Sequence, residues 1–174
     1  AALAARSISD SLLNTVISII KFYYAEIKFA PHFNIEKIKR PRGEHRLPKV
    51  ISVEDVDRLL RCTENLKHVT LLYALDGHGL RLNEILNFRL EDLLWDRNQI
   101  FVYKSKGNKD RYVNMSLEFK NILALYVHTY HPMYWLFEGQ DQKNQYSATS
   151  VQQVVRKAAK MANIKQKVTP HILR

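Results

Sequence analysis

The chain has 174 residues, of which 46% are apolar, and its 27 lysines and arginines outnumber its 17 aspartates and glutamates to give a formal charge of +10. The apolar fraction supports a packed core and excludes bulk disorder, the 5 glycines and 5 prolines exclude a collagen-like chain, and no run of about 18 apolar residues predicts a membrane span. The single Cys62 excludes an internal disulfide framework and a multi-thiolate zinc site, so we expect an intracellular, soluble and basic protein.

The first predicted element is an amphipathic helix over residues 7–28. Its apolar residues recur at spacings of three and four, and they form one stripe: Leu13, Val16, Ile20, Tyr23 and Ile27. Ser9 or Ser7 is placed to cap the start of this helix.

Residues 39–50 have the composition of a linker, with two prolines, one glycine and dense positive charge. One helix before such a linker cannot build a core of its own. We therefore divide the chain into the incomplete end of a helical domain over 1–38, a basic linker over 39–50 and a main domain over 51–174.

The main domain begins with three predicted helices. The first starts after Ser52, the second runs from about Asn65 to Leu75, and the third starts near Arg81 after a break at residues 77–79. The inner face of the first of these helices is predicted to contain Val53, Val56, Leu59 and Leu60. The third should turn its apolar residues inward, namely Leu82, Ile85 and Leu86.

A hairpin and further helices complete the predicted main domain. Residues 99–104 and 111–114 read as two strands around a turn, which predicts one antiparallel hairpin. Ser116 and Ser150 each begin a helix, and Thr169 begins another at the end of the chain. The apolar sides of the first two are predicted to be Ile122, Leu123, Tyr126 and Tyr130, and then Val151, Val154, Val155, Ala158 and Ala162. The predicted fold class is mainly α with a small antiparallel β-hairpin or sheet.

Positive charge is concentrated in three stretches, residues 37–49, 104–111 and 151–174. Solvated surface patches would explain each stretch separately. Segregated positive charge is also the electrostatic footprint of a nucleic-acid-binding surface, and we favour that interpretation.

Four separated side chains fit chemistry at a phosphodiester: Arg81 at the start of a helix, one lysine of the hairpin (Lys104, Lys106 or Lys109), and the pair His171 and Arg174. Guanidinium groups bind two non-bridging phosphate oxygens at once and neutralise the charge that develops in the transition state. A lysine or a histidine transfers protons to and from the attacking and leaving oxygens. His171 and Arg174, three residues apart, would share a helix face.

These residues lie in motifs by which the chain resembles the tyrosine recombinase (phage integrase) family, and in particular bacterial Xer-like and mobile-element integrases. The motifs are His78-Gly-Leu-Arg-Leu-Asn-Glu-Ile-Leu86, Glu91-Asp-Leu-Leu-Trp-Asp96, Lys104-Ser-Lys-Gly-Asn-Lys-Asp-Arg-Tyr-Val113 and Val168-Thr-Pro-His-Ile-Leu-Arg174. Their order and spacing make the joint match specific, and it extends over nearly the whole chain.

The resemblance implies a role for each matching position. Arg81 and Arg174 would hold the phosphate, Lys106 would protonate the leaving 5′ oxygen, and His171 would assist proton transfer. Glu84 would orient the cationic site. The family nucleophile is a tyrosine beyond the His-x-x-Arg motif, so we expect the sequence to be a fragment truncated at both ends and inactive in cleavage by itself.

The resemblance also implies double-stranded DNA as the partner, a homotetramer on DNA for the full-length protein, no cofactor and no metal. The 174 residues alone would be monomeric, and the location would be the bacterial cytoplasm at the nucleoid. The candidate DNA-binding residues are Lys39, Arg40, Arg42 and Arg46 in the linker, and Gln153, Arg156, Lys157 and Lys160 on the helix after Ser150. Arginine and glutamine suit base edges in the major groove, although contact with phosphates alone is equally compatible.

Two alternatives to a recombinase remain open from the sequence. The first is a DNA-binding module without cleavage activity, such as a decayed integrase or a regulator. The second is a DNA-relaxing enzyme with the same chemistry, similar to type IB topoisomerases. His78 stands where the family has a small residue, and we expect it to have a loop role or at most a phosphate contact.

Overall fold

The computed structural model describes residues 9–27, 39–41, 50–103 and 109–173. The chain forms two compact units, Ala1–Pro48 and Lys49–Arg174, which we describe separately. The domain boundaries proposed from the sequence remain a prediction, because residues 42–49 of the expected linker lie outside the described residues.

The described part of the first unit is one helix, α1 (Asp10–Phe22), which continues as a wider π-helical turn over Tyr23–Ile27. Ser9 caps its start, because its hydroxyl accepts a hydrogen bond from the Leu12 N–H group. None of its residues is buried. Within the predicted apolar stripe, Leu13, Val16 and Ile20 are half-buried, whereas Tyr23 and Ile27 are 43% and 60% exposed. The stripe is therefore only partly shielded from solvent.

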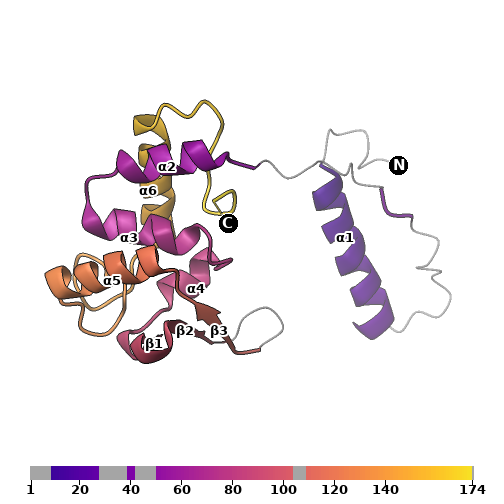
Figure 1. Cartoon of the computed structure of the whole chain (residues 1–174). Helices are drawn as coiled ribbons and strands as arrows, with labels where there is room; N and C mark the ends of the chain where they lie inside the picture. Colours follow the sequence, from indigo (N-terminus) through magenta and orange to yellow (C-terminus); the bar gives the residue numbers. More distant parts are fainter. Residues whose placement is uncertain (1–8, 28–38, 42–49, 104–108, 174) are drawn as a thin grey trace. The chain divides into compact units, whose positions relative to one another are not determined.

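The second unit is mainly helical (Figure 1). Its helices are α2 (Val53–Arg61), α3 (Leu66–Leu75), α4 (Leu82–Leu86), α5 (Leu117–Tyr130) and α6 (Ala148–Met161). Four of them begin at a polar cap whose side chain accepts a backbone N–H of the first turn: Ser52, Asn65, Ser116 and Ser147. The cap satisfies a donor that would otherwise have no partner in the helix, which explains why these helices start where they do.

A three-stranded antiparallel sheet lies beside α4. Its strands are β1 (Leu93–Leu94), β2 (Gln99–Val102) and β3 (Arg111–Asn114), in the order β1-β2-β3. Ile100 pairs with Val113 and is fully buried, whereas Tyr112 is 56% exposed. One face of the sheet therefore packs on the core and the other faces solvent.

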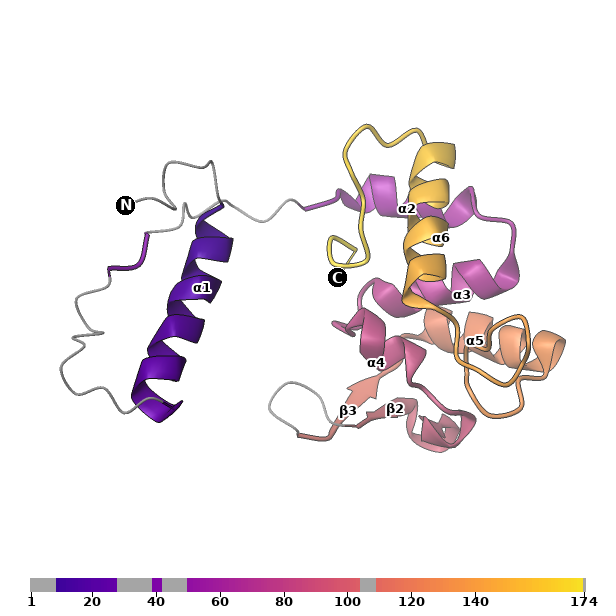
Figure 2. The same cartoon turned by 180° about the vertical axis from the view of Figure 1, so that it is seen from behind.

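Helix α3 forms the centre of the core and packs against α2, α4, α5 and α6. Figure 2 shows α6 crossing α2 and α3 on the face opposite to that in Figure 1. Leu71 and Leu75 of α3 are completely buried, as are Phe119 of α5 and Val155 of α6. These side chains come from segments far apart in the sequence, so their burial fixes how the helices pack.

The predicted fold class is confirmed, with corrections to individual residues. Val53 is 81% exposed rather than inward, because Ser52 caps the helix and sets a phase that turns its first residue outward. Tyr130 is 42% exposed at the last turn of α5, and α6 is capped by Ser147 rather than begun by Ser150. At the expected last helix, the structure describes a turn in which the Thr169 carbonyl accepts the Ile172 N–H.

Candidate active site

Arg81 is the residue immediately before α4, and a tight turn delivers it there. Gly77 and Gly79 have φ angles of +71° and +60°, which residues with a side chain rarely adopt. These two glycines let the chain reverse between α3 and α4 over a few residues. The Arg81 side chain remains 34% exposed, so it is accessible to a ligand.

Glu84, one helical turn after Arg81, holds this arginine in two ways. Its Oε2 accepts the Arg81 backbone N–H at 2.8 Å, and its Oε1 accepts the Arg81 Nη1 at 2.8 Å. The Glu84 side chain is only 8% exposed. Both ends of the arginine are thus tied to one nearly buried carboxylate, which restricts where the guanidinium can point.

Arg111, at the start of β3, binds the same carboxylate. It donates from Nη1 to Oε1 of Glu84 at 3.0 Å and from Nη2 to Oε2 at 2.8 Å. These charge-assisted hydrogen bonds raise the pKa of the Arg111 guanidinium. The sequence reasoning missed Arg111 as a site residue, since nothing local relates it to Glu84, 27 positions earlier.

His78 has the loop role that the sequence predicted, and it faces inward. Its Nδ1 lies 2.8 Å from the Asp76 carbonyl oxygen, which assigns the ring proton to Nδ1. Its Nε2 accepts the Ser116 N–H at 3.3 Å, and the ring packs 4.6 Å from that of Phe119. The imidazole therefore fastens the turn before Arg81 to the start of α5.

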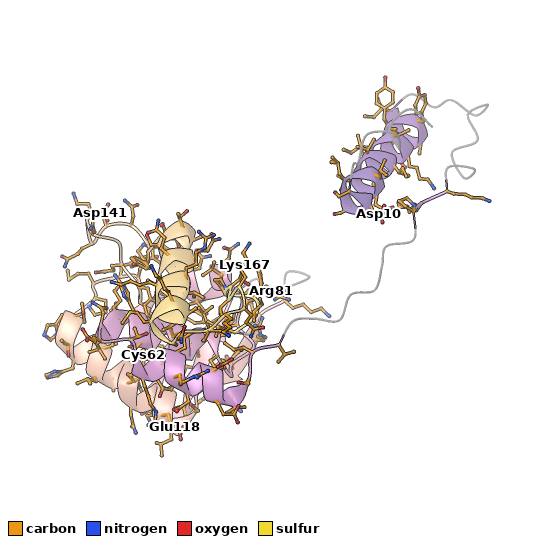
Figure 3. All side chains as sticks on the ribbon, turned by 90° about the horizontal axis from the view of Figure 1, so that it is seen from above. Asp10, Cys62, Arg81, Glu118, Asp141 and Lys167 are labelled. Carbon is orange, nitrogen blue, oxygen red and sulfur yellow. The ribbon has the colours of Figure 1, made fainter. Side chains whose placement is uncertain are left out.

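His171 lies on the turn that follows α6 and is exposed. Val168 and Leu173, on either side of the turn, are buried and fix it to the core. In Figures 1 and 2 this turn ends beside the segment that leads into α4, and Figure 3 shows Lys167, from the same stretch, on the same side of the unit as Arg81. Two of the candidate catalytic residues thus belong to neighbouring segments.

The other predicted site residues divide between described and undescribed parts of the chain. Lys106, Arg174, Arg42 and Arg46 lie outside the described residues. In the first unit, Lys39 is exposed, and Arg40 donates a hydrogen bond to the Ser18 hydroxyl at 3.2 Å.

Helix α6 presents a basic face. Its exposed side includes the four candidates proposed from the sequence, Gln153, Arg156, Lys157 and Lys160, while the opposite side is buried through residues such as Val151 and Val155. No acidic residue occurs between Ala148 and Met161. This face therefore offers only neutral and positive groups to a ligand, and polyanions are the ligands that it suits.

An open cavity of about 840 Å³ lies along this helix, and its lining includes Asn65, His68, Gln153 and Lys157. The pKa of His68 is lowered, first by burial and then by the charges of Lys67 and Lys157. The positive charges of Lys67 and Lys157 therefore lie close enough to His68 to disfavour a positive charge on its imidazole.

Among the residues that the structure describes, no group of three or more His, Cys, Asp or Glu side chains is arranged to hold a metal ion. None of the helices in the described ranges has the length and apolar character needed to cross a membrane.

Comparison with known proteins places this geometry in context. The model of the phage integrase family matches residues 49–174. Tyrosine recombinase XerA of Pyrococcus horikoshii is 30% identical over 166 residues, which cover 93% of this chain and 56% of the relative. Tyrosine recombinase XerA of Pyrococcus furiosus is 28% identical over an alignment of 181 residues that includes all of this chain and 61% of the relative. The chain thus spans little more than half the length of these curated relatives.

Solved structures have the same fold. The crystal structure of XerA recombinase matches with a TM-score of 0.67 and 25% identity, over 97% of this chain and 61% of that one. The integrase of transposon Tn1549, solved in complex with transposon right end DNA, matches with a TM-score of 0.79 over 98% of this chain and 66% of that one. Its identity is 15%, so this second likeness establishes the fold alone.

Proposed function

The chain belongs to the phage integrase family, the tyrosine recombinases, and from this membership we propose that it is part of a site-specific DNA recombinase. The substrate is duplex DNA, and the reaction is cleavage and rejoining of a phosphodiester. The single observation that carries the proposal is the arrangement at Arg81, where a fixed and accessible guanidinium stands in the family's motif at the start of α4.

In the proposed cleavage step, a tyrosine from beyond residue 174 attacks the phosphorus of the scissile phosphodiester. A 3′-phosphotyrosyl bond forms and the bond to the 5′ oxygen breaks. His171 assists removal of the tyrosine proton, and Lys106 gives a proton to the departing 5′ oxygen. Because one phosphoester replaces another, the energy for rejoining is conserved.

Arg81 and Arg174 bind the non-bridging oxygens in this scheme. Their charges match the negative charge that builds on the phosphate in the transition state. In this scheme, protein side chains accept the tyrosine proton, donate a proton to the leaving oxygen and neutralise the charge on the phosphate.

The proposed DNA interface combines α6 with the linker. The basic face of α6 would lie in or along the major groove, while Lys39, Arg40, Arg42 and Arg46 would cross the phosphate backbone. Binding by several phosphate contacts makes affinity fall steeply with salt, with a log–log slope of about −0.9 for each phosphate neutralised. On DNA the full-length protein would act as a homotetramer, and the 174 residues alone would be monomeric.

Trapping of the covalent intermediate tests the proposal. The full-length protein first selects its binding duplex from a random pool, and a nick near the cleavage point then lets the 5′ product diffuse away. We expect a protein–DNA adduct, with mass spectrometry locating the DNA on a tyrosine. Sequence-specific binding without any adduct would contradict a recombinase and favour the DNA-binding module.

A further inference from the structure

The inference concerns Arg111, which the family motifs did not single out as a site residue. Arg111 forms a bidentate ion pair with Glu84, through both terminal nitrogens and both carboxylate oxygens. Its side chain is 32% exposed and Glu84 only 8%, so the pair is partly shielded from water. In such surroundings the attraction between opposite charges is stronger than in bulk solvent.

Glu84 is shared, because the same carboxylate also binds Arg81. Its Oε1 accepts from Arg81 Nη1 at 2.8 Å and from Arg111 Nη1 at 3.0 Å. The two arginines therefore compete for one negative charge. We call Arg81, Glu84 and Arg111 the arginine–glutamate triad.

The charge balance of the triad has a direct consequence for phosphate binding. Two guanidinium groups and one carboxylate carry one net positive charge together. Within the triad, a neutral residue at position 111 would lower the sum of the charges from one positive charge to zero. An arginine neutralised in this way attracts a phosphate weakly, whether in the ground state or in the transition state.

We propose that Arg111 is a positioning residue for cleavage, which acts through Glu84. It takes up part of the Glu84 charge, so that this carboxylate orients Arg81 without cancelling its attraction for the scissile phosphate. It also ties β3 to the start of α4, and this holds the sheet and the arginine-bearing turn in one arrangement. The inference rests on the proposed recombinase function.

The test uses the full-length protein and the nicked duplex described above. Arg111→Met should lower the rate constant of adduct formation by about 10- to 100-fold, while the dissociation constant for DNA stays within about threefold. Arg111→Lys, which keeps the charge but loses the bidentate geometry, should fall between wild type and Arg111→Met.

The decisive variant is Arg111→Met combined with Glu84→Gln. With the carboxylate gone, Arg81 regains its full charge, and the double variant should form the adduct at least about threefold faster than Arg111→Met alone. A purely structural role for Arg111 predicts the opposite, because a second change in the same cluster would only add damage. Arg97→Met, which removes an arginine from an exposed position, is the matched control for loss of charge.

The outcomes separate the two claims. The inference is overturned if Arg111→Met forms the adduct at the wild-type rate, or if the double variant forms it more slowly than Arg111→Met. In either case, an adduct formed by the wild type still supports the recombinase function. Absence of an adduct from the wild type overturns the proposed function and this inference with it. Thermal unfolding of each variant checks that it is folded, and if Arg111→Met does not fold, Arg111→Lys and the double variant decide the question.

Discussion

Two short segments of the second unit share a sequence pattern and differ in what surrounds them. Arg81-Leu-Asn-Glu84 and Arg89-Leu-Glu-Asp92 each begin with an arginine and end with an acid three residues later. In both, the acid accepts the backbone N–H of the arginine at 2.8 Å and so starts a helical turn. We call them the Arg81 cap and the Arg89 cap.

The arginine side chains of the two caps have different partners. At the Arg81 cap, the guanidinium donates to the capping carboxylate of Glu84, and Arg111 donates to the same carboxylate. At the Arg89 cap, the guanidinium pairs with Glu91 at 2.9 Å and lies 5.3 Å from the Tyr134 ring centre and 5.9 Å from that of Trp135. The first cap thus holds an accessible charge within an ion cluster, whereas the second uses its charge in cation–π packing.

In both caps the local pattern sets the backbone conformation, whereas the tertiary neighbours decide what the arginine side chain contacts. Both caps fix the start of a helical turn. The segment that leads into α4 lies beside the last turn of the chain (Figure 1), whereas the Arg89 side chain packs against Tyr134 and Trp135. A function in phosphate binding should therefore depend on the first cap and be insensitive to the second.

The largest expected contrast is in cleavage by the full-length protein. Arg81→Ala should lower the rate constant of adduct formation by about a thousandfold, because a group that stabilises the transition-state charge is lost, while affinity for the duplex stays within about threefold. Arg89→Ala should leave the rate constant within about threefold of wild type. An equal loss of rate in both variants, or a parallel loss of DNA affinity in Arg81→Ala, would mean that the comparison is wrong.

The next contrast is in stability, measured by urea unfolding of the 174-residue chain. Glu84→Ala leaves two arginines facing each other without their shared carboxylate, and should lower the free energy of unfolding by about 2–4 kcal/mol. Asp92→Ala removes the acceptor of one backbone N–H, and should cost about 1 kcal/mol. Similar losses at the two positions would show that Glu84 does no more than cap its helix.

The smallest expected contrast is in how the stability of the chain depends on pH. Burial raises the pKa of Asp92, although the hydrogen bond from the Arg89 backbone opposes this effect. A carboxyl whose folded pKa is raised above the unfolded value contributes stability below the unfolded pKa, and that contribution is lost as the pH rises through the folded pKa. Asp92→Asn keeps an acceptor and removes this cost, so it should unfold at a higher urea concentration than wild type at pH 7.

The difference in urea midpoint between Asp92→Asn and wild type should disappear as the pH falls below the ordinary aspartate pKa of 3.8, where both side chains are neutral. Urea midpoints measured at several pH values check this expectation. A gap that is constant with pH would assign the effect to packing rather than to charge.

The sequence predicted most helix starts, because caps are local. Ser9, Ser52 and Ser116 each stand directly before an apolar pattern, and each caps a helix in the structure. The two-residue strand β1 escaped prediction, since two residues carry too little periodicity. Its pairing with β2 depends on tertiary contacts that no local pattern records.

The candidate site was predicted only as far as its motifs extend. Arg81 and Glu84 are one helical turn apart, so their contact follows from helix geometry. The bidentate pair of Glu84 with Arg111 joins a helix to a strand, and the inward turn of His78 depends on Phe119 and Ser116. Such contacts are decided by packing between distant segments, which the motifs leave unspecified.

A structure of the full-length protein on its DNA half-site, with the scissile phosphate intact, tests directly whether Arg81 and His171 serve one phosphate. We expect the guanidinium of Arg81 and the imidazole of His171 both to lie within hydrogen-bond distance, about 3 Å, of the oxygens of that phosphate. Contacts of these two side chains to different phosphates, or a DNA path on another face of the unit, would contradict this expectation.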